Sequence, residues 1–460
     1  MKKNSLFGKV RRIHFVGIGG IGMSGIAEVL LNLGYSVSGS DIRQTELTRR
    51  LSALGAKIYP GHSPGNLKSA QVVVVSSAIS EKNPEVIHAR RMNIQVIPRA
   101  VMLAGLGQMK KTVTVAGSHG KTTTASMTAM ALQSAGADPT IITGGYIKNI
   151  GSNARLGAGD YFVAEADESD GSFVHFSPLA AIVTNIDSDH LDYFGNMNNL
   201  KKAFLMHLSR VPFYGSAIVC ADDSHASALI PKIEAPLISY GIRKDADWLA
   251  RKIHMNASGA FFEAWFHGRR AGKVRIGIPG EHNVLNSLAA LACGSFLGFK
   301  FADLARGLEG FCGVGRRLEK LGSASGMLFM DDYAHHPTEI KAVIKAVSGN
   351  FKYERLVIIF QPHRFSRTKL VHRKMGAAFK GADMVYVMDI YPAGEKPVRG
   401  VNSGLVLDSL KKSRVPALPF TRAVDVTRDL RKGDLILTIG AGDVWKVGEE
   451  LKRRSTASIF

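Results

Sequence analysis

Cysteine is scarce in this 460-residue sequence, which contains three. They lie far apart, at Cys220, Cys293 and Cys312, without the spacing of a metal-ligand pair. An odd number of dispersed cysteines argues against a disulfide framework and indicates a reducing compartment. We therefore expect three buried thiols with a structural role.

Long apolar runs are missing as well, since none approaches the length that spans a bilayer. The basic N-terminal stretch lacks the long apolar region and the small-residue cleavage site of a signal peptide. We expect a soluble protein of the cytoplasm, with no membrane partner. At this length, two or three domains are expected.

Acidic residues are few relative to basic ones, with 38 Asp and Glu against 59 Lys and Arg, a net charge of +21. Such an excess favours acidic partners. The basic residues are spread along the chain, and no basic stretch has interleaved aromatic residues. The composition therefore favours nucleotide substrates, and we do not expect nucleic acid as a partner.

The most informative stretch that is present is TVTVAGSHGKTTT, residues 112–124. A β-branched apolar run leads to Gly117, and Gly120, Lys121 and Thr122 precede a helical pattern. Strand, glycine turn, GK-T and helix is the order of a phosphate-binding loop, here in a shortened G-x-x-G-K-T form. The lysine would supply positive charge and the threonine hydroxyl a Mg²⁺ ligand. The alternative is an ordinary strand–turn–helix joint.

A second glycine-rich turn lies near the N-terminus. A predicted strand at Arg12–Val16 is followed by GIGGIG at 17–22, a helix to about Leu33, and a strand that runs to Asp41. This fits G-x-G-x-x-G, in which a pyrophosphate lies at a helix N-terminus and a later acid binds a ribose hydroxyl. The pattern predicts a dinucleotide such as NAD or another nucleotide with a pyrophosphate.

Polar residues follow the next predicted strand, Gln71–Val75, at Ser76 and Ser77. Ligands of parallel sheets bind beyond the carboxyl ends of the strands, so both serines are candidate contacts. The alternative is that they cap the following helix.

Acidic runs follow two predicted strands of the middle region. Tyr161–Ala164 leads to EADESDG, which starts at Glu165, and Ala180–Asn185 leads to an acidic turn that contains His190. Beside a phosphate loop, these side chains indicate a divalent-metal site, because hard cations prefer carboxylate oxygens. The alternatives are a solvated loop and a structural histidine. Residues 240–280 have a more antiparallel pattern, with a hairpin turn predicted at Gly268–Arg270.

A glycine-rich joint at 310–317 indicates a domain boundary, after which a third α/β pattern begins. Two predicted strands, Met327–Met330 and Arg355–Phe360, are followed by DDYAHHP and QPHRFSR. These runs indicate an anion-binding mouth, because guanidinium groups suit carboxylate and phosphate; the alternative is a set of surface ion pairs. Upstream, Asn283 and Asn286 lie on the first turn of a predicted helix, where they can cap it or pair with a base edge.

Taken together, these motifs resemble the Mur ligases of bacterial cell-wall synthesis. The matching stretches are HFVGIGGIGMSGIA, VAGSHGKTTT, EADESDGSF, TNIDSDHLDYF, GEHNVLNSLAA, GVGRRLE, DDYAHHPTEI and FQPHRFSRT. The resemblance implies an α/β protein of three domains. These are an N-terminal Rossmann-like UDP-sugar-binding domain (1–109), a central P-loop-type ATPase domain with a mostly parallel sheet (110–313), and a C-terminal Rossmann-like domain that binds an amino acid (314–460).

The resemblance also implies a reaction, the ATP-dependent joining of L-alanine to UDP-N-acetylmuramate through an acyl phosphate, in peptidoglycan precursor synthesis. The cofactors would be ATP and Mg²⁺, with Mn²⁺ as an alternative ion. The chain would act as a monomer or homodimer.

Roles for single residues follow from the matching motifs. The resemblance implies that ATP is bound by Gly117, Ser118, His119, Gly120, Lys121, Thr122, Thr123, His282, Asn283, Asn286 and Arg317. It implies that the UDP sugar is bound by Gly17, Gly19, Gly20, Ile21, Gly22, Asp41, Ser76, Ser77 and Asn153. The amino acid would be held by Tyr333, His335, Arg364 and Arg367. The metal ligands would be Thr122, Glu165 and His190. The catalytic residues would be Lys121, Glu165, His190, Arg317 and His335, and we take His335 or Asp332 as the group that accepts the amine proton.

Three alternatives remain open. The first is the related recycling ligase, which joins a preformed tripeptide to the same UDP sugar; DDYAHHPTEI and EADESDGSF favour the single amino acid. The second is an NAD-dependent oxidoreductase built on residues 17–22, which leaves the phosphate loop and Glu165 without a role. The third is a nucleotide-gated binding protein without turnover.

Overall fold

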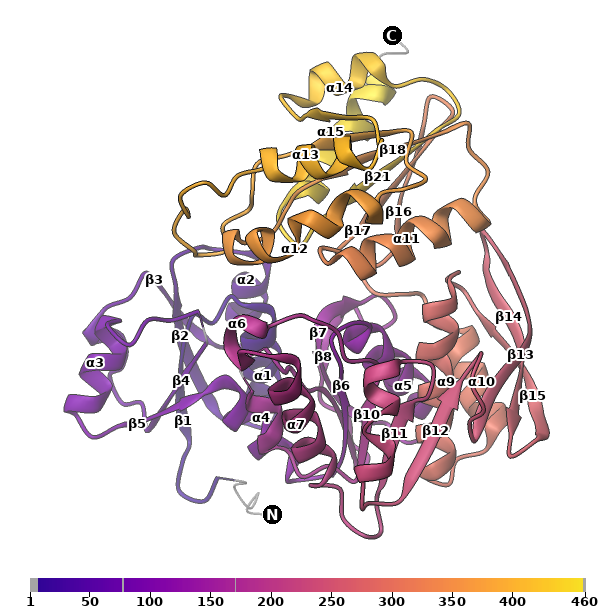
Figure 1. Ribbon diagram of the computed structural model, residues 1–460. Coiled ribbons are helices and arrows are strands. Elements are labelled where there is room, and N and C mark those ends of the chain that lie inside the picture. The colour runs from indigo at the N-terminus through magenta and orange to yellow at the C-terminus, as the bar shows by residue number, and fades with distance from the viewer. Residues whose placement is uncertain (1–6, 77, 170, 458–460) are drawn as a thin grey trace. The chain divides into compact units, whose positions relative to one another are not determined.

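The computed structural model describes residues 7–76, 78–169 and 171–457, which form three sheets covered by helices (Figure 1). The chain separates into two compact units. The first unit comprises Met1–Lys252, Phe262–Val274 and Leu285–Cys312. The second unit comprises Ile253–Phe261, Arg275–Val284 and Gly313–Phe460.

The N-terminal sheet of the first unit has five parallel strands in the order β3-β2-β1-β4-β5. Its strands are β1 (Arg12–Val16), β2 (Ser36–Asp41), β3 (Lys57–Pro60), β4 (Val72–Val75) and β5 (Gln95–Pro98). Its helices are α1 (Ile21–Asn32), α2 (Glu46–Ala53), η1 (Pro64–Asn66), α3 (Pro84–Arg91) and α4 (Arg99–Gly107). The strand order reverses between β1 and β4, and ligands of doubly wound sheets bind at this point, beyond the carboxyl ends of the strands.

The second sheet has ten strands in the order β15-β14-β13-β12-β11-β10-β6-β9-β7-β8. They are β6 (Lys111–Ala116), β7 (Thr140–Ile147), β8 (Ser152–Arg155), β9 (Tyr161–Glu165), β10 (Ala180–Val183), β11 (Ser216–Cys220), β12 (Leu237–Gly241), β13 (Trp248–Asn256), β14 (Gly259–Phe266) and β15 (Arg269–Ile276). The run from β12 through β9 to β7 is parallel, and β7 and β8 form an antiparallel pair.

The helices that accompany this sheet are α5 (Lys121–Ser134), η2 (Ser172–His175), α6 (Leu191–Phe194), α7 (Met197–Leu208), α8 (Ser224–Ser227), η3 (Ile230–Lys232), α9 (Glu281–Phe296) and α10 (Phe301–Glu309). Helix α5 is buried on all sides from Thr122 to Leu132. One cause is its close contact with α10, where a Cβ added to Gly307 would lie 2.5 Å from the Met130 carbonyl oxygen. The helix that carries the phosphate loop is thus rigidly held.

The sheet of the second unit has six strands in the order β16-β17-β21-β18-β19-β20. They are β16 (Glu319–Ala324), β17 (Met327–Asp332), β18 (Arg355–Phe360), β19 (Met384–Val387), β20 (Ala417–Pro419) and β21 (Asp434–Ile439). Within the described residues of this sheet, the β16–β17 pair is antiparallel and the other pairs are parallel. The helices are α11 (Pro337–Asn350), α12 (Phe365–Ala378), α13 (Gly404–Lys412), α14 (Ala423–Asp429) and α15 (Val444–Ala457).

The structure confirms the α/β prediction and the mostly parallel sheets. The predicted strand Ala180–Asn185 ends earlier, at Val183, and the predicted strand Met327–Met330 continues to Asp332. The predicted hairpin is present, but its turn falls at His267–Gly268, and Arg269 and Arg270 of the predicted turn already belong to β15. Both turn residues have positive φ, of 45° and 73°, as a tight two-residue connection requires.

The prediction of three buried cysteines is wrong for Cys312. Cys220 and Cys293 are buried, whereas Cys312 is exposed. Its backbone N–H donates to the Asn149 side chain at 2.8 Å, so the loop around it is held by a polar contact at the surface. Across the part of the chain that the structure describes, no helix combines the length and apolar character needed to cross a membrane.

Candidate active site

The phosphate loop follows β6 and leads into α5. Gly117 and Gly120 have positive φ of 135° and 80°, and Gly120 is the N-cap of α5. A Cβ added to Gly117 would lie 2.1 Å from Thr184 Oγ1, so a side chain cannot occupy this position. The glycines therefore let the loop pack closely while the N-terminus of α5 remains available to an anion.

Lys121, the first residue of α5, folds back over this loop. Its Nζ donates to the Gly117 carbonyl oxygen at 2.7 Å and to Glu168 Oε1 at 2.9 Å. Burial alone would lower the pKa of the ammonium, but the charges of Glu168, Asp167 and Glu165 outweigh it and raise that pKa. Lys121 is therefore a permanent cation in contact with the loop.

Glu168 is fully buried beside this lysine. Burial raises the pKa of its carboxyl to about 7 against the opposing charge of Lys121, and Asp167 adds to the increase. Its Oε2 atom is buried without a hydrogen-bond partner among the described residues. A buried carboxylate that is only partly satisfied at a phosphate loop is typical of a functional site.

Glu165, at the end of β9, links the loop to β7. Its Oε2 atom accepts hydrogen bonds from Thr122 Oγ1 and from the Gly144 N–H, both at 2.8 Å. A Cβ at Gly144 would lie 2.7 Å from the same oxygen, so the glycine permits the approach. A hydroxyl and a carboxylate oxygen in contact are ligands that suit Mg²⁺.

His190 lies after β10, at the N-cap of α6, with a φ of 56°. Its Nε2 is 3.6 Å from Asp189 Oδ2. Burial raises the pKa of Asp167, but the charges of Lys121 and Arg99 lower it. The charge of His190 makes a smaller contribution to this lowering. The structure therefore brings His190 near the acidic run that follows β9.

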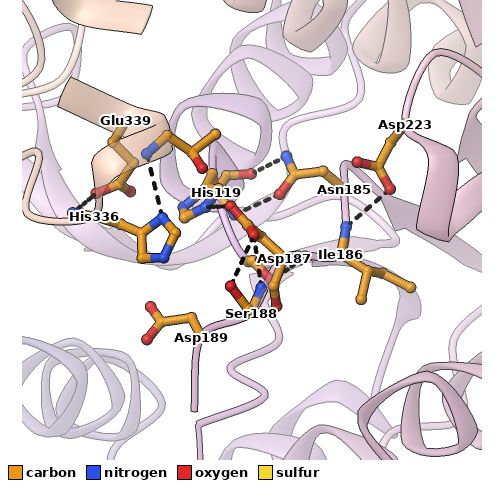
Figure 2. Close-up of polar contacts among 12 residues, drawn as sticks. His119, Asn185, Ile186, Asp187, Ser188, Asp189, Asp223, His336 and Glu339 are labelled. Atoms are coloured by element: carbon orange, nitrogen blue, oxygen red, sulfur yellow. Dashed lines mark hydrogen bonds and ion pairs between the residues drawn. The ribbon is translucent and has the colours of Figure 1, made fainter. Parts of the chain in front are cut away.

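Residues after β10 hold the phosphate loop through polar contacts with His119, as Figure 2 shows. The Asn185 side chain accepts from the His119 N–H and donates to the His119 carbonyl oxygen, both at 2.9 Å. Thr184 Oγ1 donates to the same carbonyl oxygen at 2.7 Å. His119 Nε2 lies 3.0 Å from Asp187 Oδ2. Asp223 holds the segment after β10 in place, since its Oδ1 accepts a hydrogen bond from the Ile186 N–H at 3.2 Å (Figure 2).

The N-terminal glycine turn lies at the carboxyl end of β1. The Gly17 N–H donates to the Ser40 carbonyl oxygen at 2.8 Å, and the Gly19 N–H donates to Asp41 Oδ2 at 2.8 Å. Asp41 thus holds the turn itself. A Cβ added to Gly17 would lie 3.7 Å from Ser76 Cβ, which places Ser76 at this edge, while Ser77 lies outside the described residues.

Asn153 connects this turn to the second sheet. It lies on β8, is buried, and donates from Nδ2 to the Ile21 carbonyl oxygen at 2.6 Å. Helix α1 comes so close that a Cβ on Gly25 would lie 2.8 Å from Asn153 Nδ2. The remaining predicted positions of the turn, Gly20 and Gly22, begin α1 as its N-cap and second residue.

The predicted adenine-reading residues lie on the first turns of α9. Asn283 Nδ2 donates to the Pro279 carbonyl oxygen at 2.8 Å. Asn286 accepts a hydrogen bond from Thr124 Oγ1 at 3.0 Å. Burial lowers the pKa of His282 to about 4, with a further contribution from the charge of Arg317. His282 is therefore neutral at physiological pH.

In the second unit, two arginines flank Tyr333 after β17. The guanidinium carbons of Arg316 and Arg317 both lie 5.1 Å from the centre of the Tyr333 ring. Arg316 has a structural role, because it pairs with Asp331 at 2.9 Å and donates to the Gly440 and Gly442 carbonyl oxygens. Arg317 is thus the better placed of the two for a ligand.

Histidines and arginines meet at the ends of β17 and β18. The His335 ring lies 5.7 Å from the Tyr333 ring and 5.8 Å from the His363 ring, and Arg367 Nη1 is 3.3 Å from His363 Nδ1. Burial lowers the pKa of His363 to about 3, with further lowering by the charges of His335, Arg367 and Arg364. Arg364 Nε is buried without a hydrogen-bond partner in the described part of the chain. Such a mouth suits an anion.

Asp332, the last residue of β17, is also buried here. Its two carboxylate oxygens accept hydrogen bonds from the Leu318 and Ala334 N–H groups at 2.7 and 2.8 Å. Burial raises the pKa of this carboxyl to about 6, against the charge of Arg317 and these hydrogen bonds. Asp332 therefore shapes the loop that carries Tyr333 and His335.

Known proteins resemble the chain along nearly all of its length. Three family models match: Mur ligase family, catalytic domain, at residues 12–111; Mur ligase middle domain, at residues 115–294; and Mur ligase, glutamate ligase domain, at residues 316–442. The UDP-N-acetylmuramate–L-alanine ligase of Endomicrobium trichonymphae is 50% identical over 446 residues, 97% of this chain and 99% of that protein. The chain belongs to the Mur ligase family.

Two further similar proteins are also named as ligases of UDP-N-acetylmuramate and alanine. The UDP-N-acetylmuramate–L-alanine ligase of Geobacter sp. (strain M21) is 48% identical over 458 residues, 98% of this chain and 99% of that protein. The crystal structure of UDP-N-acetylmuramate-alanine ligase MurC from Thermotoga maritima is 30% identical, with a TM-score of 0.83 and coverage of 97% of this chain and 99% of that one. The resemblance seen in the sequence motifs is thus confirmed.

Sequence reasoning about this Mur ligase missed several residues of the site. Glu168 was part of a recognised acidic run, but only the structure shows its contact with Lys121. Thr184 and Asn185 were placed inside a strand, whereas they leave it to hold the phosphate loop. The signal was available in the motif TNIDSDH, because polar side chains that directly follow a buried parallel strand lie at the ligand edge of a sheet.

Proposed function

We propose that this Mur ligase catalyses ATP + UDP-N-acetylmuramate + L-alanine → ADP + phosphate + UDP-N-acetylmuramoyl-L-alanine. The names of the similar proteins and the likeness to the Thermotoga maritima structure support this reaction. The main support is the phosphate loop itself, in which the buried Lys121 pairs with the carboxylate of Glu168.

The chemistry requires activation of an inert acid. A carboxylate is a poor acyl donor because its leaving group would be oxide. Transfer of the γ-phosphoryl group of ATP to the muramoyl carboxylate gives ADP and an acyl phosphate, from which phosphate can leave. The neutral amine of L-alanine then attacks the acyl carbon and forms the amide. The side chains contribute chiefly position and charge to such a transfer.

The residues of the phosphate loop fit this role. The loop from Gly117 to Thr123 would hold the phosphates of ATP, with Lys121 at the γ-phosphate. Lys121 already lies between the loop carbonyl groups and Glu168, so its charge is preorganised. Thr122 and Glu165, with His190, would hold Mg²⁺, and the bound ion would neutralise charge on the phosphoryl group.

The residues of the second unit would receive L-alanine. We assign its carboxylate to Arg364 and Arg367, because Arg364 has a buried nitrogen in need of an acceptor. We assign the amine proton to His335 in preference to Asp332. The Asp332 oxygens already accept two main-chain hydrogen bonds, whereas His335 Nδ1 lies 3.0 Å from the Tyr333 carbonyl oxygen. A proton held on Nδ1 leaves Nε2 as the basic nitrogen.

We further propose the division into domains at 1–109, 110–313 and 314–460, which the ranges of the three family models support. The adenine would be read by Asn283 and Asn286, and the UDP sugar bound at 17–22. We propose a cytoplasmic reaction, since ATP is the energy source, and either a monomer or a homodimer.

The test is phosphate release measured with each substrate omitted in turn. We expect release only when ATP, UDP-N-acetylmuramate and L-alanine are all present, and the ligated product in equal amount. Lys121→Ala should lower the rate by at least about a hundredfold, since it removes a preorganised charge. Ligation at the unmodified rate by that variant would refute the mechanism.

The same assay decides between substrates. L-alanine and a preformed tripeptide are compared at equal concentration, with glycine and L-serine as further amines. A preference for the tripeptide would replace the proposal with the recycling reaction. Nucleotide binding without phosphate release under any combination would indicate a binding protein.

A further inference from the structure

The segment that follows β19 packs against the chain between β18 and α12. The Tyr391 N–H donates to the Pro362 carbonyl oxygen, and the Tyr391 carbonyl oxygen accepts from the Arg364 N–H, both at 2.8 Å. The Tyr391 ring also lies nearly parallel to the His363 ring, at an interplanar angle of 8° with the centres 5.7 Å apart. This segment therefore contacts the histidines and arginines that meet at the end of β18.

A strained turn in the same segment brings a carboxylate to the start of α12. Ala393 and Gly394 both have positive φ, of 47° and 88°, and the Glu395 N–H donates to the Pro392 carbonyl oxygen at 2.9 Å. An alanine with positive φ is unfavourable, and such strain persists where the surrounding structure requires it, often at functional sites. The observation to explain is therefore what Glu395 does at the end of this turn.

Glu395 caps the N-terminus of α12 from outside the helix. Its Oε2 accepts a hydrogen bond from the Ser366 N–H at 3.0 Å, and its Oε1 accepts one from the Ser366 hydroxyl at 2.5 Å. Within the described helix, the N-cap residue Arg364 makes no side-chain cap, and the first turn contains no acidic residue. A carboxylate at this position satisfies a main-chain N–H that the helix cannot pair and is favoured by the positive end of the helix dipole.

The first turn of α12 also carries both arginines that we assign to the carboxylate of L-alanine. Arg364 is the N-cap and Arg367 is the third residue of the helix. Two cations beside the positive end of a helix are unfavourable, so this turn needs a negative charge to keep its form before a substrate binds. Glu395 supplies that charge at Ser366, which lies between the two arginines in the sequence.

We propose that Glu395 is a positioning residue of the amino-acid site, which fixes the first turn of α12 and thereby holds Arg364 and Arg367 ready for a carboxylate. The proposal rests on the proposed function, which assigns these two arginines to L-alanine. Preorganisation of this kind strengthens binding, because the substrate does not have to order the arginines itself. The effect concerns the amino acid, so the KM values for ATP and UDP-N-acetylmuramate should not depend on Glu395.

The test is phosphate release by the full chain, with each of the three substrates varied in turn. Glu395→Met removes the charge and both hydrogen bonds, Glu395→Gln removes the charge and keeps an amide oxygen as acceptor, and Ser366→Ala removes one of the two contacts. Asp425→Asn is the matched control, because Asp425 also lies in the first turn of a helix, α14, where it accepts from Thr421 Oγ1 at 2.9 Å. Circular dichroism and thermal melting show whether each variant folds.

We expect Glu395→Met to raise the KM for L-alanine about three- to tenfold and Glu395→Gln to raise it by a smaller factor. The value of kcat and the other two KM values should change less than about twofold in these variants. The double variant Glu395→Met/Ser366→Ala should have the same KM for L-alanine as Glu395→Met, since both changes break the same contact. Asp425→Asn should behave as the unmodified chain does.

An unchanged KM for L-alanine in the folded Glu395 variants, or an equal rise in all three KM values, would overturn the proposal alone. If Glu395→Met does not fold, Glu395→Gln and Ser366→Ala decide by the same criterion. Failure of the unmodified protein to release phosphate with L-alanine would overturn the proposed function and this proposal with it.

Discussion

Replacement of Glu85 by Gln should destabilise the N-terminal sheet, because this carboxylate is the centre of a buried polar network. Glu85 lies at the start of α3 with a side chain that is 0% exposed. It accepts hydrogen bonds from Ser40 Oγ at 2.5 Å and from Asn66 Nδ2 at 2.6 Å. Two histidines face it, with His62 Nδ1 at 3.2 Å and His14 Nε2 at 3.6 Å.

The magnitude follows from the pKa of this carboxyl. Burial alone would raise the pKa of Glu85, but the neighbouring His14 and the hydrogen bonds from Ser40 and Asn66 outweigh it and lower the pKa from 4.5 to about 2. This difference corresponds to about 3 kcal/mol of stability for the ionised form. Because the folded-state pKa is the lower one, the contribution is present above pH 4.5. It is lost as the pH falls from about 4.5 towards about 2.

Urea-induced unfolding of residues 12–41, followed by hydrogen exchange and mass spectrometry, measures this effect. At pH 7 we expect Glu85→Gln to lower the free energy of unfolding by about 3 kcal/mol, and we expect the difference from the unmodified protein to shrink as the pH falls from about 4.5 towards about 2. Glu81→Gln is the control, since Glu81 is 75% exposed and pairs with Arg90 at the surface. It should change little. A Glu85→Gln variant as stable as this control would refute the reasoning.

Three further predictions concern the phosphate loop of the first unit and the arginines of the second unit. Gly117→Ala should abolish ATP binding or prevent folding, because φ is 135° and Thr184 Oγ1 would lie 2.1 Å from the new Cβ. Calorimetry measures ATP binding and circular dichroism measures folding, so together they distinguish these outcomes. Normal ATP binding would contradict the geometry. Thr122→Val should raise the Mg²⁺ concentration needed for half-maximal phosphate release about tenfold or more, whereas Thr122→Ser should not, because the hydroxyl that contacts Glu165 is kept. Arg364→Met should raise the KM for L-alanine by about tenfold or more and leave the KM for ATP unchanged; an unchanged KM for L-alanine would remove Arg364 from the amino-acid site.

The local structure was largely predictable from the sequence. Strands such as β1 and β18 were predicted at their observed bounds, because apolar runs of this length between turn residues fit a parallel sheet covered on both faces. The glycine turn and the phosphate loop were identified from residue spacing, since positive φ and close packing at Gly17 and Gly117 require glycine. The weaker β7–β8 pair carried no such signal and was missed.

What the sequence determined by itself is therefore the set of elements and the chemistry that each strand end carries. Whether two strand ends meet depends on the order of strands in the sheet, and that order results from packing between residues far apart in the chain. The contact of Lys121 with Glu168, the hold of Asn185 on His119, and the contact of Glu395 with Ser366 all join separate segments in this way. Residue types and local spacing contain no information on these distances, so the tertiary structure alone decided them.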